Sequence, residues 1–264
     1  MNELHVLAIT ATCGRHDLLE RSVGCFVAQD YTGPHTLLIY NNSEVQQELR
    51  LPILPANKHI ELINNHIDEQ TGKQYDNLGA IYRDALLEVS SEVDLIYHQD
   101  DDDLFLPNHI TEGVNGYLRG WGGEYNEGFK AYKPQFSWFR HPLGIDKMSN
   151  NLEPSIFIEA IYLKNHGYKL TTTDQHYGWY QPLLEEQALF VDPNGIPTLV
   201  YNWGDTNIPT FKTSGAAGNP DNFNNYRAFS RDHGDRFISP WPEGKLAPYY
   251  QEVYRERDFK IILK

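Results

Sequence analysis

Four consecutive aspartates are the residues of this sequence whose type and spacing most directly indicate chemistry: Asp100, Asp101, Asp102 and Asp103. They follow the segment 94–97 (DLIY), whose apolar residues are typical of a buried strand. Adjacent carboxylates beside an apolar strand repel one another, and a hard divalent cation removes that cost because carboxylate oxygens are its preferred ligands. The sequence therefore predicts a site for Mn²⁺ or Mg²⁺. The alternative is a solvated acidic turn in which one aspartate caps a helix.

Two more polar clusters follow predicted strands. Residues 4–9 lead into the cluster 10–12 (TAT), and residues 36–40 lead into the cluster 41–43 (NNS). In a sheet of parallel strands, ligands bind beyond the carboxyl ends of the strands. We therefore expect both clusters to meet the aspartates and to line one binding site.

The elements that must position these clusters alternate along the first half of the chain. Apolar residues at helical spacing predict one helix after Asp17, which we expect to be its N-cap, and a second over residues 78–89. Residues 60–63 are predicted to form another short strand. This alternation predicts an α/β domain with a mostly parallel central sheet that helices cover on both faces.

The second half of the chain has a less regular pattern. Residues 116–128 are glycine-rich and polar, and aromatic side chains crowd residues 121–139, either as core or as a platform for an acceptor. The remaining predictions are an apolar segment over 155–162, a helix over 183–190, a turn over 192–195, a strand over 198–203 and a loop or lid over 206–225. No internal repeat or linker divides the chain, which favours a single domain.

Composition and charge restrict the classes of function. The 264 residues carry a formal net charge of −14, which opposes a nucleic-acid partner unless Lys130, Lys133, Arg140 and Lys147 form a local basic strip. The 2 cysteines indicate reduced thiols rather than a disulfide framework. No secretory signal or apolar run of membrane-spanning length is visible, so we expect a cytoplasmic protein, in the host cytoplasm if a phage encodes it.

Four motifs follow one another in the first half of the chain. They are Thr10 with Gly14 and Arg15, the segment 29–31 (QDY), the stretch from Asn77 to Arg83, and the segment 97–107 (YHQDDDDLFLP). In this order they resemble the nucleotide loop, the end of the first helix, the Asn-x-Gly stretch and the aspartate motif of the inverting family 2 glycosyltransferases, which have the GT-A fold. The resemblance covers about residues 4–110 well and residues 153–205 loosely.

The resemblance implies a Rossmann-like GT-A fold of one domain. Residues 1–110 would form the half that binds the nucleotide-sugar donor. Residues 111–264 would form the half that binds the acceptor and supplies the catalytic base, with a C-terminal lid or tail. Within the aspartate motif, the resemblance implies that Asp102 binds the metal directly and that Asp100 faces the metal or the ribose. Asp101 occupies the variable position at the nucleotide sugar, and Asp103 orders the loop.

The resemblance also implies nucleotide contacts outside the aspartate motif. Thr10, Thr12 and Arg15 would border the nucleotide. Arg83 would pair with a phosphate, unless it forms an ordinary ion pair on the helix surface. Asn41 stands where the family commonly has an aspartate that accepts the uracil N–H, and its amide oxygen can accept the same hydrogen bond. UDP is therefore the favoured nucleotide.

The second half must supply a general base, because inverting transfer needs a group that takes the proton of the acceptor hydroxyl. Asp174 is the best positional match to the base of the family. Glu185 and His176 are its rivals, and each is otherwise a solvated or structural side chain. Asp205 binds the metal or the diphosphate, or is an ordinary turn carboxylate.

The predicted function is metal-assisted transfer of a sugar, with inversion, from a nucleotide sugar to the hydroxyl of a glycan, polysaccharide or small molecule. One alternative acceptor is a hydroxylated base in DNA, as in phage DNA-modifying glycosyltransferases. Another alternative is a non-catalytic module that binds nucleotide sugars. A metal-dependent phosphohydrolase would need a further series of spaced ligands, which the sequence lacks.

Overall fold

The central sheet is built from the apolar strands that the sequence predicts. The computed structural model describes residues 3–51, 53–122, 128–141, 144–150, 152–171, 175–202, 237–240 and 260–263. In it, seven strands join in the order β11-β7-β10-β5-β1-β2-β4. Their bounds are β1 Val6–Thr12, β2 His35–Asn41, β4 Lys58–Asn64, β5 Leu95–His98, β7 Ala131–Pro134, β10 Phe157–Glu159 and β11 Leu189–Asp192. β1, β2, β4 and β5 are mutually parallel, and β10 runs antiparallel between β5 and β7.

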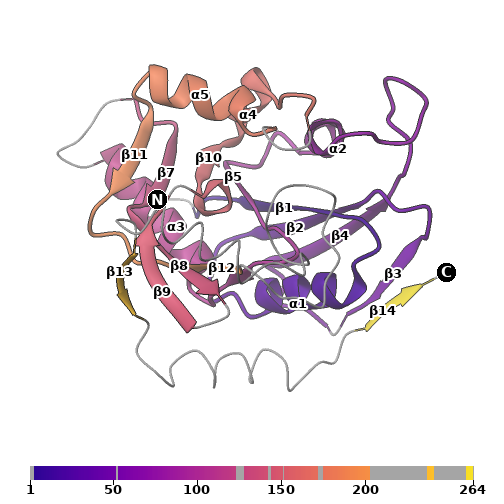
Figure 1. Cartoon of the computed structure of the whole chain (residues 1–264), viewed down its shortest axis with the longest axis horizontal. Coiled ribbons are helices and arrows are strands. Elements are labelled where there is room, and N and C mark those ends of the chain that lie inside the picture. Colours follow the sequence, from indigo (N-terminus) through magenta and orange to yellow (C-terminus); the bar gives the residue numbers. More distant parts are fainter. Residues whose placement is uncertain are drawn as a thin grey trace.

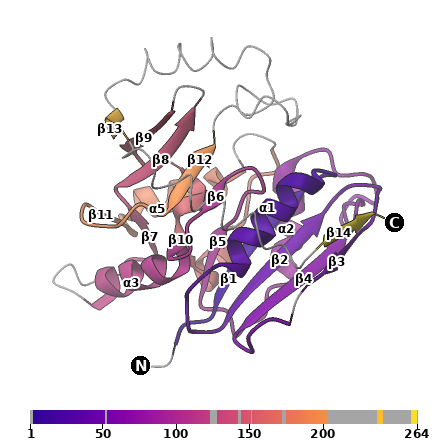
Figure 2. The same cartoon turned by 90° about the horizontal axis from the view of Figure 1, so that it is seen from below.

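Helices cover both faces of this sheet (Figures 1 and 2). They are α1 His16–Val27, α2 Leu78–Leu87, α3 His109–Gly122, α4 Ala160–His166 and α5 Tyr177–Glu185. Val6 and Ala8 of β1 pack in one core with α1 and α3, whereas Leu7 and Ile9 pack in a second core with α2, α4 and α5. Successive side chains of a strand point to opposite faces of the sheet. A strand that is apolar throughout therefore needs a layer of helices on each face. The predicted α/β architecture with a mostly parallel sheet is confirmed.

Two smaller sheets extend this domain. One has the strand order β13-β9-β8-β12-β6, and in the other β14 pairs with β3. The bounds are β3 Gln47–Arg50, β6 Leu104–Phe105, β8 Phe136–His141, β9 Gly144–Ser149, β12 Leu199–Asn202, β13 Phe237–Pro240 and β14 Lys260–Leu263. β6 directly follows the aspartates and pairs with β12, which ties the end of the aspartate loop to the second half of the chain.

The first part of the glycine-rich stretch 116–128 is helical, which the sequence pattern did not indicate. α3 continues to Gly122. A Cβ atom on Gly113, Gly116 or Gly120 would come within 2.2, 2.0 and 2.6 Å of the rings of Phe157, Tyr132 and Phe190, respectively. These glycines therefore let the helix backbone approach three aromatic rings closely.

Two predicted details in the helical regions were wrong, namely the N-cap at Asp17 and the bounds of the helix over 183–190. Asp17 lies inside α1, whose N-cap is Arg15 without a capping side chain. The apolar segment over 155–162, for which no element type was predicted, divides into the end of the 3₁₀ helix η1 (Glu153–Ser155), β10 and the start of α4. The helix expected over 183–190 begins at Tyr177 and ends at Glu185, because Gln187 has the left-handed φ of 54° that terminates a helix.

Other predictions for the second half are confirmed or lie outside the described residues. The turn over 192–195 is present, with the N–H of Gly195 donating to the carbonyl oxygen of Asp192 at 3.1 Å. The predicted strand over 198–203 forms as β12, although Trp203 is not described. The loop or lid over 206–225 also lies outside the described residues. In the described part of the chain, no helix is long and apolar enough to cross a membrane.

Candidate functional site

The carboxyl ends of β5, β1 and β2 meet at one edge of the central sheet. Thr12 of β1 stands in register with Asn41 of β2. Thr10 Oγ1 donates a hydrogen bond to the carbonyl oxygen of Gln99 at 2.6 Å, and Thr12 Oγ1 donates to Asp101 Oδ2 at 2.7 Å. The three polar clusters that the sequence places at strand ends therefore lie together.

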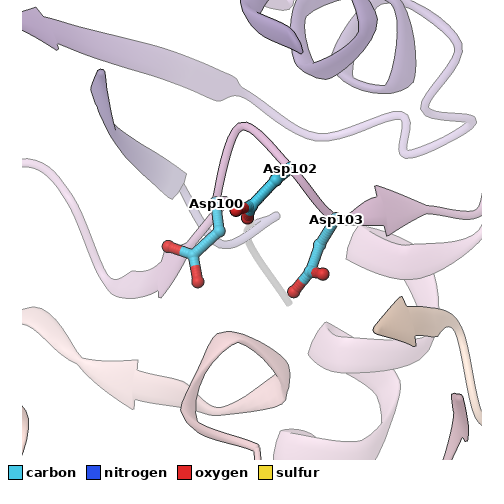
Figure 3. Close-up of side chains that lie close together, drawn as sticks. All are labelled: Asp100, Asp102 and Asp103. Carbon is cyan, nitrogen blue, oxygen red and sulfur yellow. The ribbon is translucent and has the colours of Figure 1, made fainter. Parts of the chain in front are cut away.

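Three of the four aspartates turn toward one another. Asp100, Asp102 and Asp103 each offer a carboxylate oxygen, and these oxygens lie within 4.8 Å of one another (Figure 3). Asp103 is buried, whereas Asp100 and Asp102 are half-buried. A set of hard carboxylate oxygens suits Mg²⁺ or Mn²⁺ rather than a soft metal. The donor set therefore fits the predicted metal, and it includes Asp103 as well as the predicted Asp100 and Asp102.

The remaining aspartate, Asp101, is fully buried and faces α1 and β1. It accepts the hydrogen bond from Thr12 and forms an ion pair with Arg15. Arg15 also contacts Asp102, with 3.2 Å between Nη1 and Oδ2. Arg21 of α1 donates to the carbonyl oxygen of Asp102. Two arginines thus hold the aspartate loop from the side of α1.

Burial and mutual repulsion raise the pKa of two of these carboxyls. Burial, with Asp102 and Asp101 adding to it, raises the pKa of Asp100 to about 7. Burial also raises the pKa of Asp101 to about 6, although the charge of Arg15 acts in the opposite direction. The site therefore holds costly negative charge near neutral pH, which a bound cation would stabilise.

Asn41 and Arg83 have protein partners in this structure. The Asn41 amide donates to Asn64 Oδ1 at 2.8 Å and to the carbonyl oxygen of Val45 at 2.9 Å. Arg83 pairs with Asp68 at 2.8 Å and with Asp84 at 2.7 Å. Arg83 therefore fastens the segment after β4 to α2, which is the ion-pair alternative that the sequence left open.

A pocket opens beside Asp100, on the side of the second half of the chain. It has a volume of about 180 Å³, and its lining includes Asp100, Glu153, Gln175, His176, Tyr177 and Tyr201. It is smaller than the ~300–1,000 Å³ of pockets that enclose a whole drug-sized ligand. Its size and polar lining suit one part of a larger ligand.

Two of the predicted base candidates are described, and they differ in position. His176 lines the pocket, is 8% exposed, and packs against the rings of His98 and Tyr82. Burial lowers the pKa of His176 to about 3. Glu185 is exposed and lies eight residues beyond Tyr177 in α5, about 12 Å along the helix axis. Asp174 and Asp205 lie outside the described residues.

The sequence reasoning missed several residues at the site, among them Arg21, Tyr82, Glu153 and Tyr201. Arg21 and Tyr82 occupy helix positions that read as ordinary amphipathic helix. The pair Glu153-Pro154 is a helix-start signal, but nothing in its spacing relates it to Asp100, 53 residues earlier. Only the packing of distant segments brings these side chains to the aspartates.

Comparisons of the whole fold find solved proteins of similar architecture, among them a mannosyltransferase. S. aureus TarS 1–349 in complex with UDP superposes with a TM-score of 0.54 at 9% identity, covering 95% of this chain and 69% of that chain. The same protein in complex with UDP-GlcNAc gives a TM-score of 0.53 at 8% identity, covering 95% and 70%. The mannosyltransferase PcManGT from Pyrobaculum calidifontis, in complex with GDP-Man and Mn²⁺, gives 0.51 at 11% identity, covering 76% and 57%.

The sequence comparisons add no closer relative. No protein-family model matches the chain, and no curated protein matches it. In two further superpositions, the chain spans 60% of the length of TarS 1–349 and 42% of a second TarS structure. At 8–11% identity the likeness concerns the fold, so this chain shares the GT-A-like fold of these glycosyltransferases.

Proposed function

We propose that the protein is a glycosyltransferase that uses a nucleotide sugar, with a divalent cation and inversion at the anomeric carbon. The observation that carries the proposal is the convergence of Asp100, Asp102 and Asp103 at the carboxyl end of β5, with their oxygens within 4.8 Å. They lie beside the ends of β1 and β2, where ligands of such sheets bind. The solved proteins with this fold include complexes with UDP, UDP-GlcNAc, and GDP-Man with Mn²⁺, which supports the proposal.

On the donor side, Asp102, Asp100 and Asp103 would hold Mn²⁺ or Mg²⁺, which supplies positive charge for the leaving diphosphate when bound. Arg15 is the cation that we place at the diphosphate, because it already lies against Asp101 and Asp102. Arg83 instead pairs with Asp68 and Asp84, which lie outside the aspartate run. Thr10 and Thr12 order the strand ends through their hydrogen bonds and border the nucleotide.

On the acceptor side, Asp174 remains our proposed base, because it directly precedes Gln175 and His176, which both line the pocket. Apart from Asp100, which we place at the cation, Glu153 is the carboxylate of the described lining that competes with it. His176 is a poor proton acceptor at neutral pH, since burial lowers its pKa to about 3. Glu185 is exposed at the far end of α5.

UDP is the proposed nucleotide, and a glycan or small molecule is the proposed acceptor. The DNA alternative needs a free basic strip, and the described lysines do not favour one. Lys133 is 4% exposed, Lys130 pairs with Glu159, and Lys147 lies 4.5 Å above the ring of Phe136. The cytoplasmic location stays a prediction from the sequence.

A thermal-shift panel tests the donor side. UDP-, GDP-, dTDP- and ADP-sugars are compared with and without Mn²⁺. We expect one nucleotide sugar to raise the melting temperature by about 5 °C at 100 times its Kd, with Mn²⁺ required. Asp102→Asn should abolish the metal-dependent part of the shift, whereas Asp76→Asn, which removes an exposed acid, should retain it. Absence of any shift across the panel would refute the proposed function, and binding without sugar transfer or hydrolysis would favour the non-catalytic alternative.

A further inference from the structure

A block of rings, most of them buried, lies beside Asp100. It consists of Tyr82 from α2, His98 from β5, the half-buried Tyr168, His176 at the N-cap of α5, and Trp179 from α5, and we call it the aromatic block. Tyr82 and Tyr168 are stacked with 5.2 Å between ring centroids and 20° between planes. His98 stacks on Trp179 at 5.6 Å and 8°, and meets Tyr82 edge-on at 5.0 Å. The ring of Tyr82 is therefore packed against the rings of His98, Tyr168 and His176.

One polar group of this block reaches the aspartates. The Tyr82 hydroxyl donates a hydrogen bond to Asp100 Oδ1 at 3.1 Å, and Tyr82 is only 1% exposed. A carboxylate on a short loop can rotate about its side-chain bonds, so its oxygens need a partner to hold one orientation. A donor on a rigid, packed ring restricts that rotation.

We propose that Tyr82 is a positioning residue for Asp100: its hydroxyl fixes the orientation in which Asp100 presents its carboxylate to the cation. The inference rests on the proposed function, since it assumes that the aspartates bind a cation. The aromatic block also contains His176, which lines the pocket with Asp100. The same packing therefore connects the donor aspartates with the segment that carries the acceptor side of the pocket.

Tyr82→Phe tests this role because it removes the hydroxyl and keeps the ring in its stack. Mn²⁺ is titrated into the protein with saturating UDP, or GDP if the donor panel selects guanine, and free Mn²⁺ is measured by electron paramagnetic resonance. We expect the Kd for Mn²⁺ to rise at least 10-fold, as for other partners of metal ligands. The affinity for the nucleotide without metal should stay that of the wild type.

Tyr117→Phe is the matched control. Tyr117 is also a buried tyrosine, and its hydroxyl donates to a carboxylate, Glu159 Oε1, at 2.7 Å in a part of the molecule away from the aspartates. Its loss should leave Mn²⁺ binding unchanged. Circular dichroism at the titration temperature checks that each variant is folded.

The outcomes separate the two proposals. Unchanged Mn²⁺ affinity in Tyr82→Phe would overturn the positioning role alone, and so would equal weakening in Tyr82→Phe and Tyr117→Phe. A wild-type protein that binds no Mn²⁺ with either nucleotide would overturn the proposed function and, with it, the role of Tyr82.

Discussion

Asp101 and Asp102 are adjacent in the chain but lie in different surroundings. Asp101 is fully buried and is held by Thr12 and Arg15, whereas Asp102 joins Asp100 and Asp103 in the carboxylate cluster. Arg15 contacts both carboxylates, so it supplies positive charge to both surroundings. The four aspartates therefore divide into a cluster of three and one buried anchor.

Mutation of single residues tests directly which side chain is the general base. We expect Asp174→Asn to lower kcat by about 10²–10⁴-fold, because the acceptor hydroxyl loses its proton acceptor. The affinity for the nucleotide sugar should change little. Glu153→Gln tests the competing carboxylate of the pocket, and Glu185→Gln is the exposed control. If Glu153→Gln alone abolishes turnover, then Glu153 is the base and the assignment of Asp174 is wrong.

Among the elements, α3 departs most from its sequence pattern. Four glycines in fourteen residues oppose a helix on propensity alone. Three of them, Gly113, Gly116 and Gly120, nonetheless line the face that packs on Phe157, Tyr132 and Phe190. Close packing of backbone on aromatic rings buries apolar area that offsets the poor propensity. The same packing holds β7 and β10, and β10 pairs with β5 to join the second half of the chain to the first half of the sheet.

Gly116→Ala tests whether packing or propensity decides the stability of α3. Alanine gains about 1 kcal/mol of helix propensity over glycine. Its Cβ would lie 2.0 Å from the buried ring of Tyr132, and overpacking of a core costs about 1–3 kcal/mol. We expect a net loss of stability in urea unfolding. Asn115→Ala, at the exposed neighbouring position, should be neutral or slightly stabilising. A more stable Gly116→Ala would contradict the packing account.

On the scale of the whole molecule, the two cores bury several titratable side chains. Burial lowers the pKa of His109 and of His176 to about 3 and holds that of His98 well below its usual value of 6.5. The unfolded chain therefore binds protons that the folded chain excludes as pH falls below 6.5. Asp100 and Asp101 act in the opposite sense, because their pKa values are raised and the folded state takes up their protons first.

We accordingly expect the metal-free protein to be less stable at pH 5 than at pH 7. Each buried histidine lowers the free energy of unfolding by up to about 2 kcal/mol at pH 5, and the two aspartates recover part of the total. Urea unfolding in EDTA at both pH values measures the difference. Asp100→Asn should make the decline steeper, because it removes a group that stabilises the fold on protonation. Equal stability at the two pH values would contradict the burial of neutral histidines.

The sequence by itself determined the elements and the place of the site. Apolar runs, helical spacing and turn residues act over a few neighbours, so β1, β2, β5, α1 and α2 could be predicted from local pattern. Because β1, β2 and β5 are parallel, residues 10–12, 41–43 and 100–103 had to meet at one edge. The convergence of polar clusters followed from the periodicity of the chain alone.

Only the tertiary structure decided which partner each side chain has. Arg83 pairs with Asp68 and Asp84 rather than standing free. Tyr82, on α2, donates a hydrogen bond to Asp100 in the loop after β5. Glu153 reaches the pocket from a segment after β9. These contacts depend on how layers pack and on which buried charge needs a counter-charge, and both are set by residues far apart in the sequence.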